Sequence, residues 1–348
     1  MAEPVRVGVL RFEHYHANFW TKAFKQTADA ELVGFWEPDD ALAEAAVATH
    51  GIRRFDDINA LIESCGALAI CSATARHVEL VERVAAKGKA ILCEKPIAHT
   101  EAGCRRIHDI VAESGVIFMQ SFPKRFDPIN HELRALVEER ALGDITMVRV
   151  RHGHNHGTMM PGFGDAWFTD PALSGGGTLI DEGVHAADFL RWVFGEPETV
   201  SATISSSALG LRVEDSALAI FTWASGLVAE VSTSWSFAAA DTSIEIYGTE
   251  GTVLLGGVDI ASRPGREKDF LRVFRRGAEG GSWSSSPTVP AFKTGVFHEH
   301  VAWNFAAALR NGRPMPVTLE DGWWAFAMIE AAYRSVATGR RETIAYPG

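Results

Sequence analysis

The sequence predicts a mixed fold, in which an N-terminal doubly wound parallel sheet of the Rossmann type precedes an α+β domain built on a large, mostly antiparallel open sheet. The chain has 348 residues, a length typical of two domains. Up to residue 122, short apolar runs alternate with helical segments, which is typical of an α/β sheet covered by helices. Beyond Pro123, several strand-like runs follow one another without long helices, which favours antiparallel pairing. We therefore expect domains over residues 1–122 and 123–348.

The first domain is expected to consist of strand–helix pairs. Short apolar runs indicate buried strands, and apolar residues at helical spacing indicate the helices between them. Gly51 and Gly88 are expected to end two of the helices. The expected strands cover 5–10, 31–36, 68–72, 90–93 and 116–120, and the expected helices cover 17–28, 40–50, 78–87 and 101–114. The carboxyl ends of such strands form the ligand crevice of a doubly wound sheet.

The second domain is expected to be rich in strands. A helix over 131–140 and a strand over 145–151 precede several strands between 199 and 255. The segment 277–286 is rich in glycine and serine and is expected to form a mobile loop. Helices over 297–310 and 319–337 are expected to return and cover this second domain.

Composition and charge restrict the class of protein. The 44 acidic residues exceed the 33 basic ones and give a net charge of -11, which argues against nucleic acid or an anionic membrane as partner. The start of the chain is polar, and the sequence contains no uncharged apolar run of the roughly 18 residues that a membrane span needs. The four cysteines lie in the first third without a C-x-x-C pair, so we expect reduced, buried thiols and a soluble cytoplasmic protein.

One stretch, G-G-G-T-L-I-D-E-G-V-H-A-A-D-F-L-R-W over 175–192, has the residues of a general base. Asp181, His185 and Asp188 are spaced four and then three residues apart, so one helix would carry all three side chains on one face. An acid one turn from an imidazole accepts its second N–H, fixes its tautomer and raises its basicity. The glycines are expected to allow close approach to a ligand or a sharp turn. The alternative is an N-cap aspartate followed by a histidine that is satisfied inside the fold.

A second motif, Cys93-Glu94-Lys95-Pro96, lies about eighty residues upstream. Glu94-Lys95-Pro96, the G-G-G-x-x-x-D-x-G-x-H block of 175–185 and P-x-T-x-E-D-G over 316–322 together resemble the glucose-fructose oxidoreductase / inositol dehydrogenase (Gfo/Idh/MocA) family along nearly the whole chain. The resemblance implies an NAD(P)-dependent oxidoreductase that acts on CH–OH groups of a sugar, sugar derivative, polyol or cyclitol. It also implies a homodimer or homotetramer that pairs through the open face of the second sheet.

The resemblance implies the catalytic roles. Lys95 is expected to lie beside the nicotinamide, to stabilise alkoxide character on the substrate oxygen, and to follow the family in having a cis bond to Pro96. His185 is expected to exchange the hydroxyl proton, and Asp181 to orient or assist it. The alternative for Lys95 is a solvent-exposed lysine at a strand end, paired with Glu94.

The loop after the first strand departs from the dinucleotide fingerprint G-x-G-x-x-G/A, because Arg11, Glu13 and His16 occupy the glycine positions. A carboxylate at position 13 would repel a diphosphate unless it pointed away. Arg11 would supply positive charge in place of the glycines, and the helix N-terminus would still bind phosphate through its free N–H groups. His14 and His16 are expected either to contact ligand or to cap the following helix.

Glu37 ends the second strand, where the fingerprint expects an acid that accepts the ribose hydroxyls. A carboxylate there would repel a 2′-phosphate, which favours NAD over NADP; the alternative is a surface loop charge. The residues expected at the cofactor are Gly8, Leu10, Arg11, Phe12, His14, Glu37, Ser72, Ala73, Thr74, His77, Glu94 and Lys95.

His152, His154 and His156 alternate along the end of an expected strand and would share one face. No acid or cysteine at supporting spacing completes a metal site, so no metal is expected. We expect sugar binding instead, with indole faces against the ring and basic groups at its hydroxyls. The residues expected at the substrate are His16, Arg125, His154, Trp167, Asp181 and His185, with Lys124 nearby. Pro123 stands where the family commonly has an asparagine.

Two other functions fit the sequence. A non-catalytic member would bind a sugar or nucleotide as a sensor or scaffold, its glycine loop having decayed. An enzyme that uses bound NAD transiently would oxidise and re-reduce a sugar to permit elimination or epimerisation. The altered loop favours the first, whereas Lys95, Asp181 and His185 together favour an enzyme.

Overall fold

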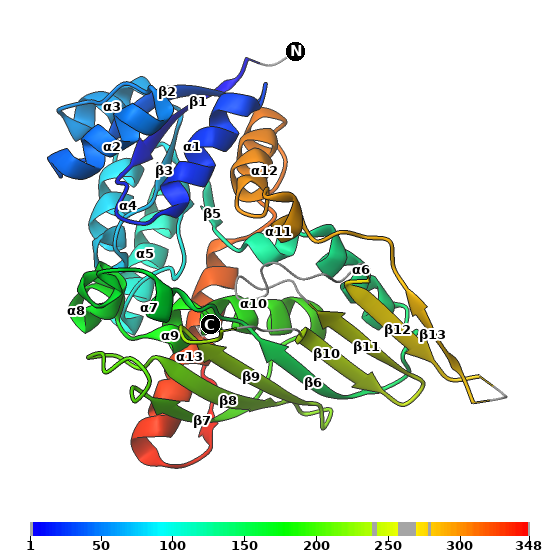
Figure 1. Ribbon diagram of the computed structural model, residues 1–348. Coiled ribbons are helices and arrows are strands. Elements are labelled where there is room, and N and C mark those ends of the chain that lie inside the picture. The colour runs from blue at the N-terminus through cyan, green and yellow to red at the C-terminus, as the bar shows by residue number, and fades with distance from the viewer. Residues whose placement is uncertain (1–2, 239–241, 257–268, 278–279, 347–348) are drawn as a thin grey trace. The chain divides into compact units, whose positions relative to one another are not determined.

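The computed structural model describes residues 3–238, 242–256, 269–277 and 280–346 (Figure 1). The chain forms two compact units. The first contains residues 1–123, 172–175 and 297–323, and the second contains residues 124–171, 176–296 and 324–348. Within the described ranges, no helix combines the length and apolar character that crossing a membrane requires.

The first unit is built on a five-stranded parallel sheet, as the sequence predicts, and the strand order is β2-β1-β3-β4-β5. Its strands bury valine, leucine, isoleucine and alanine, because helices cover both faces of such a sheet. The N-terminal elements are β1 Val5–Leu10, α1 His16–Gln26, β2 Ala30–Trp36, α2 Asp40–His50, α3 Ile58–Ser64, β3 Ala67–Ile70, α4 His77–Ala85, β4 Ala90–Cys93, α5 Glu101–Ser114 and β5 Phe118–Gln120. Strand order reverses between β1 and β3, so the ligand crevice is expected at the ends of these two strands.

Local chemistry explains where these helices begin and end. Asp39 caps α2 by accepting from the N–H of Leu42, and Gly51 ends α2 in a left-handed conformation, as predicted. Thr100 caps α5 in the same way, and Gly115 ends it. The short helix α3 was not predicted from the sequence, although Asp57 caps it.

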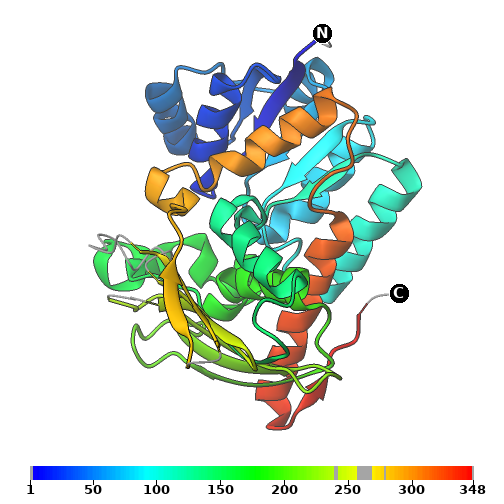
Figure 2. The ribbon, with the colours of Figure 1, turned by 90° about the vertical axis from the view of Figure 1, so that its right-hand side faces the viewer.

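Helix α12, Glu299–Arg310, belongs to the first unit and packs on α1 (Figure 2). The Trp303 indole N–H donates to the carbonyl of Ala23 at 3.1 Å, and Lys22 pairs with Glu299 at 3.0 Å. The expectation that this segment covers the second domain is therefore wrong. The start of α13, Leu319–Thr338, lies in the same unit, where Thr318 and Asp321 cap each other's backbone N–H.

The second unit is built on a nine-stranded sheet of order β13-β12-β11-β10-β6-β9-β8-β7-β14, with every pair antiparallel except β6–β9 (Figure 1). Its strands are β6 Ile145–Arg151, β7 Thr199–Ser205, β8 Ser216–Thr222, β9 Val228–Ser234, β10 Thr242–Gly248, β11 Gly251–Gly256, β12 Leu271–Arg275, β13 Ser282–Ser285 and β14 Glu342–Thr343. Its helices are α6 Pro128–Glu138, α7 His156–Met159, α9 Thr178–Asp181, α10 Gly183–Phe194, α11 Ala291–Thr294 and α13 from residue 324 onward. Helix α8 Pro171–Ser174 has residues in both units.

The Gly/Ser-rich segment is not simply a loop. Residues 282–285 form β13, which pairs with β12 in register from Arg272 opposite Ser285 to Arg275 opposite Ser282. The expectation of a mobile loop is wrong for these four residues, and residues 278–279 lie outside the described ranges. The serine-rich sequence of β13 shows no strand pattern that could have predicted it, and the strand is defined by its hydrogen bonds to β12.

Candidate active site

The three glycines of the 175–192 stretch occupy positions where a side chain would clash with neighbouring parts of the protein. Gly175 has a φ of 87°, so the expected sharp turn is present there. A Cβ on Gly176 would lie 2.2 Å from the Tyr333 hydroxyl, and one on Gly177 would lie 1.9 Å from the carbonyl oxygen of Glu214. Gly176 and Gly177 are therefore required by contacts within the second unit, whatever ligand the segment approaches.

Glu214 anchors the start of α9. Its carboxylate accepts from the N–H groups of Gly177 and Leu179, both at 3.0 Å, and from the Tyr333 hydroxyl at 2.7 Å. Burial raises the pKa of Glu214 above its ordinary value, and these hydrogen bonds only partly offset that rise. This carboxylate does the work of an N-cap for the short helix that ends at Asp181.

The expected single helix through Asp181, His185 and Asp188 is wrong, because α9 ends at Asp181 and α10 begins at Gly183. The two acids have partners of their own. Asp181 accepts from the Trp235 indole N–H at 3.1 Å, and Asp188 forms a buried ion pair with Arg125 at 2.6 Å. The alternative in which Asp181 caps a helix is also wrong, since Glu182 is the residue that precedes α10 and it makes no side-chain cap bond.

Glu182 joins two of the three histidines that the sequence placed together. His152 Nε2 lies 3.1 Å and His154 Nε2 3.2 Å from the Glu182 carboxylate, and both imidazoles are buried. His152 and His154 share a face as expected, whereas His156 begins α7 and departs from it. Burial would raise the pKa of Glu182, but the two histidine hydrogen bonds outweigh burial and hold it well below the ordinary value.

An acid therefore does complete a cluster with metal-ligand atoms, so the reason given above for expecting no metal is wrong. The ligand atoms of His154, Asp181 and Glu182 lie within 4.8 Å of one another. His154 Nδ1, however, accepts from the N–H of His156 at 3.2 Å. The proton of a neutral His154 is then on Nε2, where it is donated to Glu182 and no lone pair faces a cation.

His185 follows one helical turn beyond this cluster. It is buried, and its ring centroid lies 5.1 Å from that of His152 in an edge-to-face contact.

Three further residues expected at or near the substrate lie elsewhere in the second unit. Arg125 belongs to the 3-10 helix Pro123–Phe126, and its guanidinium donates hydrogen bonds to the Asp188 carboxylate. Trp167 is half-buried on the 3-10 helix Trp167–Thr169 and packs edge-on against Phe168. Lys124 is buried.

In the first unit, Lys95 follows β4 and is 3% exposed, so the alternative of a solvent-exposed lysine is wrong. The Lys95–Pro96 bond is cis, as expected. Glu94 is completely buried, accepts from the backbone N–H of Lys95 at 2.5 Å, and contacts His16 Nδ1 with its other oxygen. The ligand atoms of His14, His16 and Glu94 lie within 4.8 Å of one another.

In the loop between β1 and α1, Arg11 has a backbone conformation that usually requires glycine. Arg11 has a φ of 73°, a left-handed conformation that costs a non-glycine residue roughly 1–2 kcal/mol. His14 caps the helix, because its Nδ1 accepts from the N–H of His16 at 3.2 Å. The N–H groups of Ala17 and Asn18 donate to the carbonyls of His14 and Tyr15. The expectation of free N–H groups at the start of α1 is therefore wrong for these three residues.

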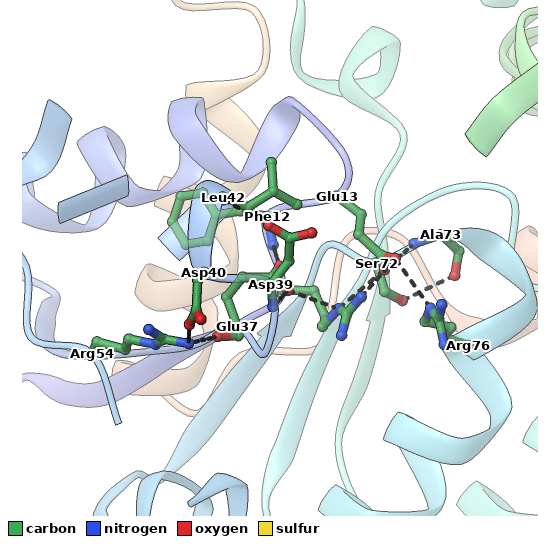
Figure 3. Close-up of polar contacts among 11 residues, drawn as sticks. Phe12, Glu13, Glu37, Asp39, Asp40, Leu42, Arg54, Ser72, Ala73 and Arg76 are labelled. Atoms are coloured by element: carbon green, nitrogen blue, oxygen red, sulfur yellow. Dashed lines mark hydrogen bonds and ion pairs between the residues drawn. The ribbon is translucent and has the colours of Figure 1, made fainter. Parts of the chain in front are cut away.

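Arg11 brings positive charge to this loop as expected, and a carboxylate of the same loop already binds it. Arg11 binds the carboxylate of Glu13 with Nη2 at 2.6 Å and Nε at 3.1 Å. Glu13 also accepts from the N–H of Ala73 and from Arg76 Nε, at 3.0 and 3.1 Å (Figure 3). Glu13, which occupies the second glycine position of the fingerprint, thus joins the loops that follow β1 and β3.

Glu37 ends β2 as expected but is not a surface charge, since its side chain is fully buried. Its carboxylate accepts from the N–H groups of Phe12 at 2.7 Å and Asp39 at 3.1 Å, and Arg11 Nε lies 3.5 Å away (Figure 3). Arg54, the cation beside it, donates to the carbonyl of Glu37 and to the carboxylate of Asp40.

The other residues expected at the cofactor have structural contacts of their own. A Cβ on Gly8 would lie 2.9 Å from Cys65 Sγ, so this glycine is required by core packing. His77 is fully buried, and burial lowers its pKa despite the contact of Nδ1 with the carbonyl of Ile97. Leu10 is completely buried at the end of β1. Ser72 donates to the carbonyl of Ala73, and Thr74 begins the 3-10 helix Thr74–Arg76.

The side chains of the first unit suit the ribose of a dinucleotide better than its diphosphate. Glu37 has carboxylate lone pairs beyond those used by two backbone N–H groups, which suits ribose hydroxyls. Two guanidinium groups, those of Arg11 and Arg76, lie at the loops that follow β1 and β3, and both are bound to Glu13. These groups suit a diphosphate in charge, but the Glu13 carboxylate already binds both.

Sequence reasoning missed Glu182, Glu214, Tyr333, Trp235 and Arg76. Glu182 could have been found, because it lies inside the 175–192 motif next to Asp181 and is an acid that could pair with His152 and His154. Glu214 and Tyr333 had no signal, because Glu214 lies 37 residues from its partner Gly177, and Tyr333 lies 119 residues from its partner Glu214.

The fold and these residues define a nicotinamide-dinucleotide oxidoreductase of two units. The chain belongs to the Gfo/Idh/MocA oxidoreductase family. Residues 5–122 match the oxidoreductase family with an NAD-binding Rossmann fold, and residues 130–254 match the GFO/IDH/MocA C-terminal domain.

Two curated relatives match nearly the whole chain. An inositol 2-dehydrogenase from Rhizobium meliloti is 31% identical over 98% of this chain and 99% of its own. A 1,5-anhydro-D-fructose reductase from Ensifer adhaerens is 26% identical over 94% and 95%. Among solved structures, a levoglucosan dehydrogenase in complex with NADH and levoglucosan superimposes with a TM-score of 0.81 at 21% identity, covering 98% of this chain and 99% of its own. This last likeness concerns the fold.

Proposed function

We propose that the protein is an NAD-dependent dehydrogenase or reductase for one carbinol carbon of a polyol, sugar, sugar derivative or cyclitol. The observation that carries the proposal is similarity to an inositol 2-dehydrogenase along the whole chain, in a sequence that has Lys95, Asp181 and His185 in the family's motifs. A bound nicotinamide would supply the hydride chemistry. We assign cofactor binding to the first domain, residues 1–122, and substrate binding to the second, residues 123–348.

In this proposal His185 takes the proton from the alcohol during oxidation and returns it during reduction. Asp181 assists it, and the Trp235 N–H fixes the direction of the Asp181 carboxylate. Lys95 donates to the substrate oxygen and stabilises negative charge as it develops there. The burial of Lys95 supports this role, because a desolvated ammonium interacts more strongly with a nearby oxyanion than an exposed one.

We assign recognition of substrate hydroxyls to His154 and ring stacking to Trp167. Arg125 contributes indirectly, since its guanidinium already holds Asp188. His16 already contacts Glu94, so its part is to position that carboxylate next to Lys95.

We propose NAD as the cofactor in preference to NADP. A 2′-phosphate placed at the end of β2 would meet the carboxylate oxygens of Glu37. Arg54, the cation that could neutralise such a phosphate, is bound to Asp40 at 2.8 Å. The remaining cofactor contacts are assigned to the ends of β1, β3 and β4, at the residues named above.

We propose a cytoplasmic enzyme, as the four buried free cysteines suit a reducing compartment. We also propose a homodimer or homotetramer that pairs through the open face of the nine-stranded sheet. On that face Ile220, Glu230 and Arg149 lie side by side in register across three strands. Ile220 and Met147 leave more than a third of their surface exposed there, as an apolar patch at an interface would.

One observation favours the rival, a non-catalytic sugar or nucleotide sensor. Glu13 ties together the two loops between which a dinucleotide would pass. A sensor has no need of Lys95, Asp181 and His185 together, so we rank it second.

Titration with NADH tests the proposal. NADH should quench the fluorescence of the ten tryptophans with a saturable curve, and NADPH should do so at higher concentrations. A panel of inositols, aldoses and anhydrosugars with NAD should then yield NADH for at least one compound. Saturable NADH binding without turnover on any polyol would favour the sensor. Absence of NADH binding would overturn the proposed function.

A further inference from the structure

Glu13 occupies the part of the sheet where a ligand is expected. In a doubly wound sheet the ligand lies where strand order reverses, at the carboxyl ends of the two strands that flank the reversal. In this chain these strands are β1 and β3. Glu13 comes from the loop after β1 and accepts from Ala73 and Arg76, which follow β3.

The donors around Glu13 are those of an anion site. Arg11 presents its guanidinium edge as a fork to both carboxylate oxygens, and Arg76 and the Ala73 N–H complete the set. Guanidinium forks and backbone N–H groups are the donors that bind phosphate oxygens in proteins. Burial alone would raise the pKa of Glu13, but these donors and the two positive charges lower it, so an anion is bound there at neutral pH.

Three of the alternative donors for a diphosphate are already in use. In the Rossmann fingerprint the diphosphate lies at the N-terminus of the helix after the first strand. Here the N–H groups of His16, Ala17 and Asn18 donate to His14 and Tyr15. A diphosphate in this crevice therefore depends on the two arginines.

We propose that Glu13 is an internal competitor for the diphosphate of the dinucleotide: its carboxylate leaves the site when the cofactor binds, and Arg11 and Arg76 then bind the phosphates. This inference rests on the proposed function, because its ligand is the dinucleotide. Arg11 stays in place after the exchange, since Glu37 lies 3.5 Å from its Nε and the Trp36 ring 5.7 Å from its guanidinium carbon. The Arg76 side chain is 44% exposed and is able to turn towards a ligand.

The competitor reduces the apparent affinity by the fraction of molecules in which the site is open. If Glu13 is bound in about nine molecules of ten, its removal tightens cofactor binding about tenfold. The effect is confined to ligands with a diphosphate. Adenosine, which has no phosphate, binds equally with and without Glu13.

The experiment measures the dissociation constants of NADH, ADP and adenosine by calorimetry for the wild type, Glu13→Ala and Glu13→Gln. Glu79→Gln is the matched control, because it removes the same charge from an exposed ion pair with Arg83 in the same unit. We expect Glu13→Ala to bind NADH and ADP about tenfold tighter or more, Glu13→Gln to lie between it and the wild type, and Glu79→Gln to match the wild type. Adding Arg76→Ala to Glu13→Ala should abolish most of the gain.

Each other result overturns the inference. Unchanged or weaker NADH binding by a folded Glu13→Ala would show that Glu13 does not compete, and weaker binding in particular would make it a ligand contact; the proposed function would stand. Equal tightening of adenosine would show that the effect is not on the diphosphate. If neither the wild type nor Glu13→Ala bound NADH, the proposed function would fail together with the inference.

Discussion

Replacing Tyr333 with phenylalanine tests whether Glu214 anchors the segment that carries Asp181. The change removes one hydroxyl bond of 2.7 Å to a carboxylate whose other donors are the N–H groups of Gly177 and Leu179. A hydrogen bond to a charged group contributes about 1.5–3 kcal/mol, so we expect Tyr333→Phe to lower the free energy of unfolding by about 2 kcal/mol at neutral pH. The missing hydroxyl also leaves space beside Gly176.

The cost should depend on pH. The folded-state pKa of Glu214 is raised above its ordinary value of 4.5. A carboxyl with a raised pKa contributes stability that is present below its unfolded pKa and is lost as pH rises through the folded one. Without the Tyr333 hydroxyl this pKa rises further, because that bond favours the charged form. The difference between wild type and variant should therefore grow as pH rises through the raised folded-state pKa of Glu214.

Urea unfolding at several pH values, followed by tryptophan fluorescence, measures this difference. Tyr15→Phe is the matched control, because it removes the same hydroxyl from a side chain that is 69% exposed. It should cost less than about 0.5 kcal/mol. The reasoning is refuted if Tyr333→Phe costs no more than Tyr15→Phe, or if its cost is the same at pH 4 and pH 8.

Three further predictions concern the proposed chemistry. NADH should bind more tightly than NADPH by calorimetry, because the buried Glu37 carboxylate accepts ribose hydroxyls and repels a phosphate; equal affinities would contradict this assignment. Lys95→Ala should lower kcat by roughly a hundredfold or more, since charge stabilisation at the reacting oxygen contributes on the order of 3 kcal/mol, while NADH affinity stays within a few-fold. A near-normal kcat would remove Lys95 from the mechanism. Alcohol oxidation by the wild type should rise with pH, and His185→Gln should lower kcat by roughly a hundredfold and flatten that rise. A wild-type pH profile in His185→Gln would place the base elsewhere.

The parallel sheet could be predicted because each strand is a short apolar run with no competing pattern. Val5–Leu10 and Ala90–Cys93 begin and end where the sequence predicts. The seven-residue helix Ile58–Ser64 is too short to show a helical period, and it was missed.

The site was harder to predict because its contacts join distant segments. Residue types identified His152 and His154, but only the fold brings Glu182 to them. The break of the helix at Glu182 was hidden as well, since the 4+3 spacing of Asp181, His185 and Asp188 suits an unbroken helix. Residue spacing within one segment indicates which functional groups can share a face. The hydrogen-bond and ion-pair partners of those groups come from other segments and are known only from the fold.

The packing of α12 on α1 has a consequence for synthesis of the protein. Residues 297–323, which complete the first unit, leave the ribosome after every strand of the second unit's main sheet except β14 has been made. At roughly 5–20 residues per second, the roughly 170 intervening residues take about 10–35 s. During that time the surface of α1 around Lys22 and Ala23 lacks its partner, because Glu299 and Trp303 do not yet exist. A fragment that ends near residue 122 lacks the same partner and should aggregate where the full chain folds.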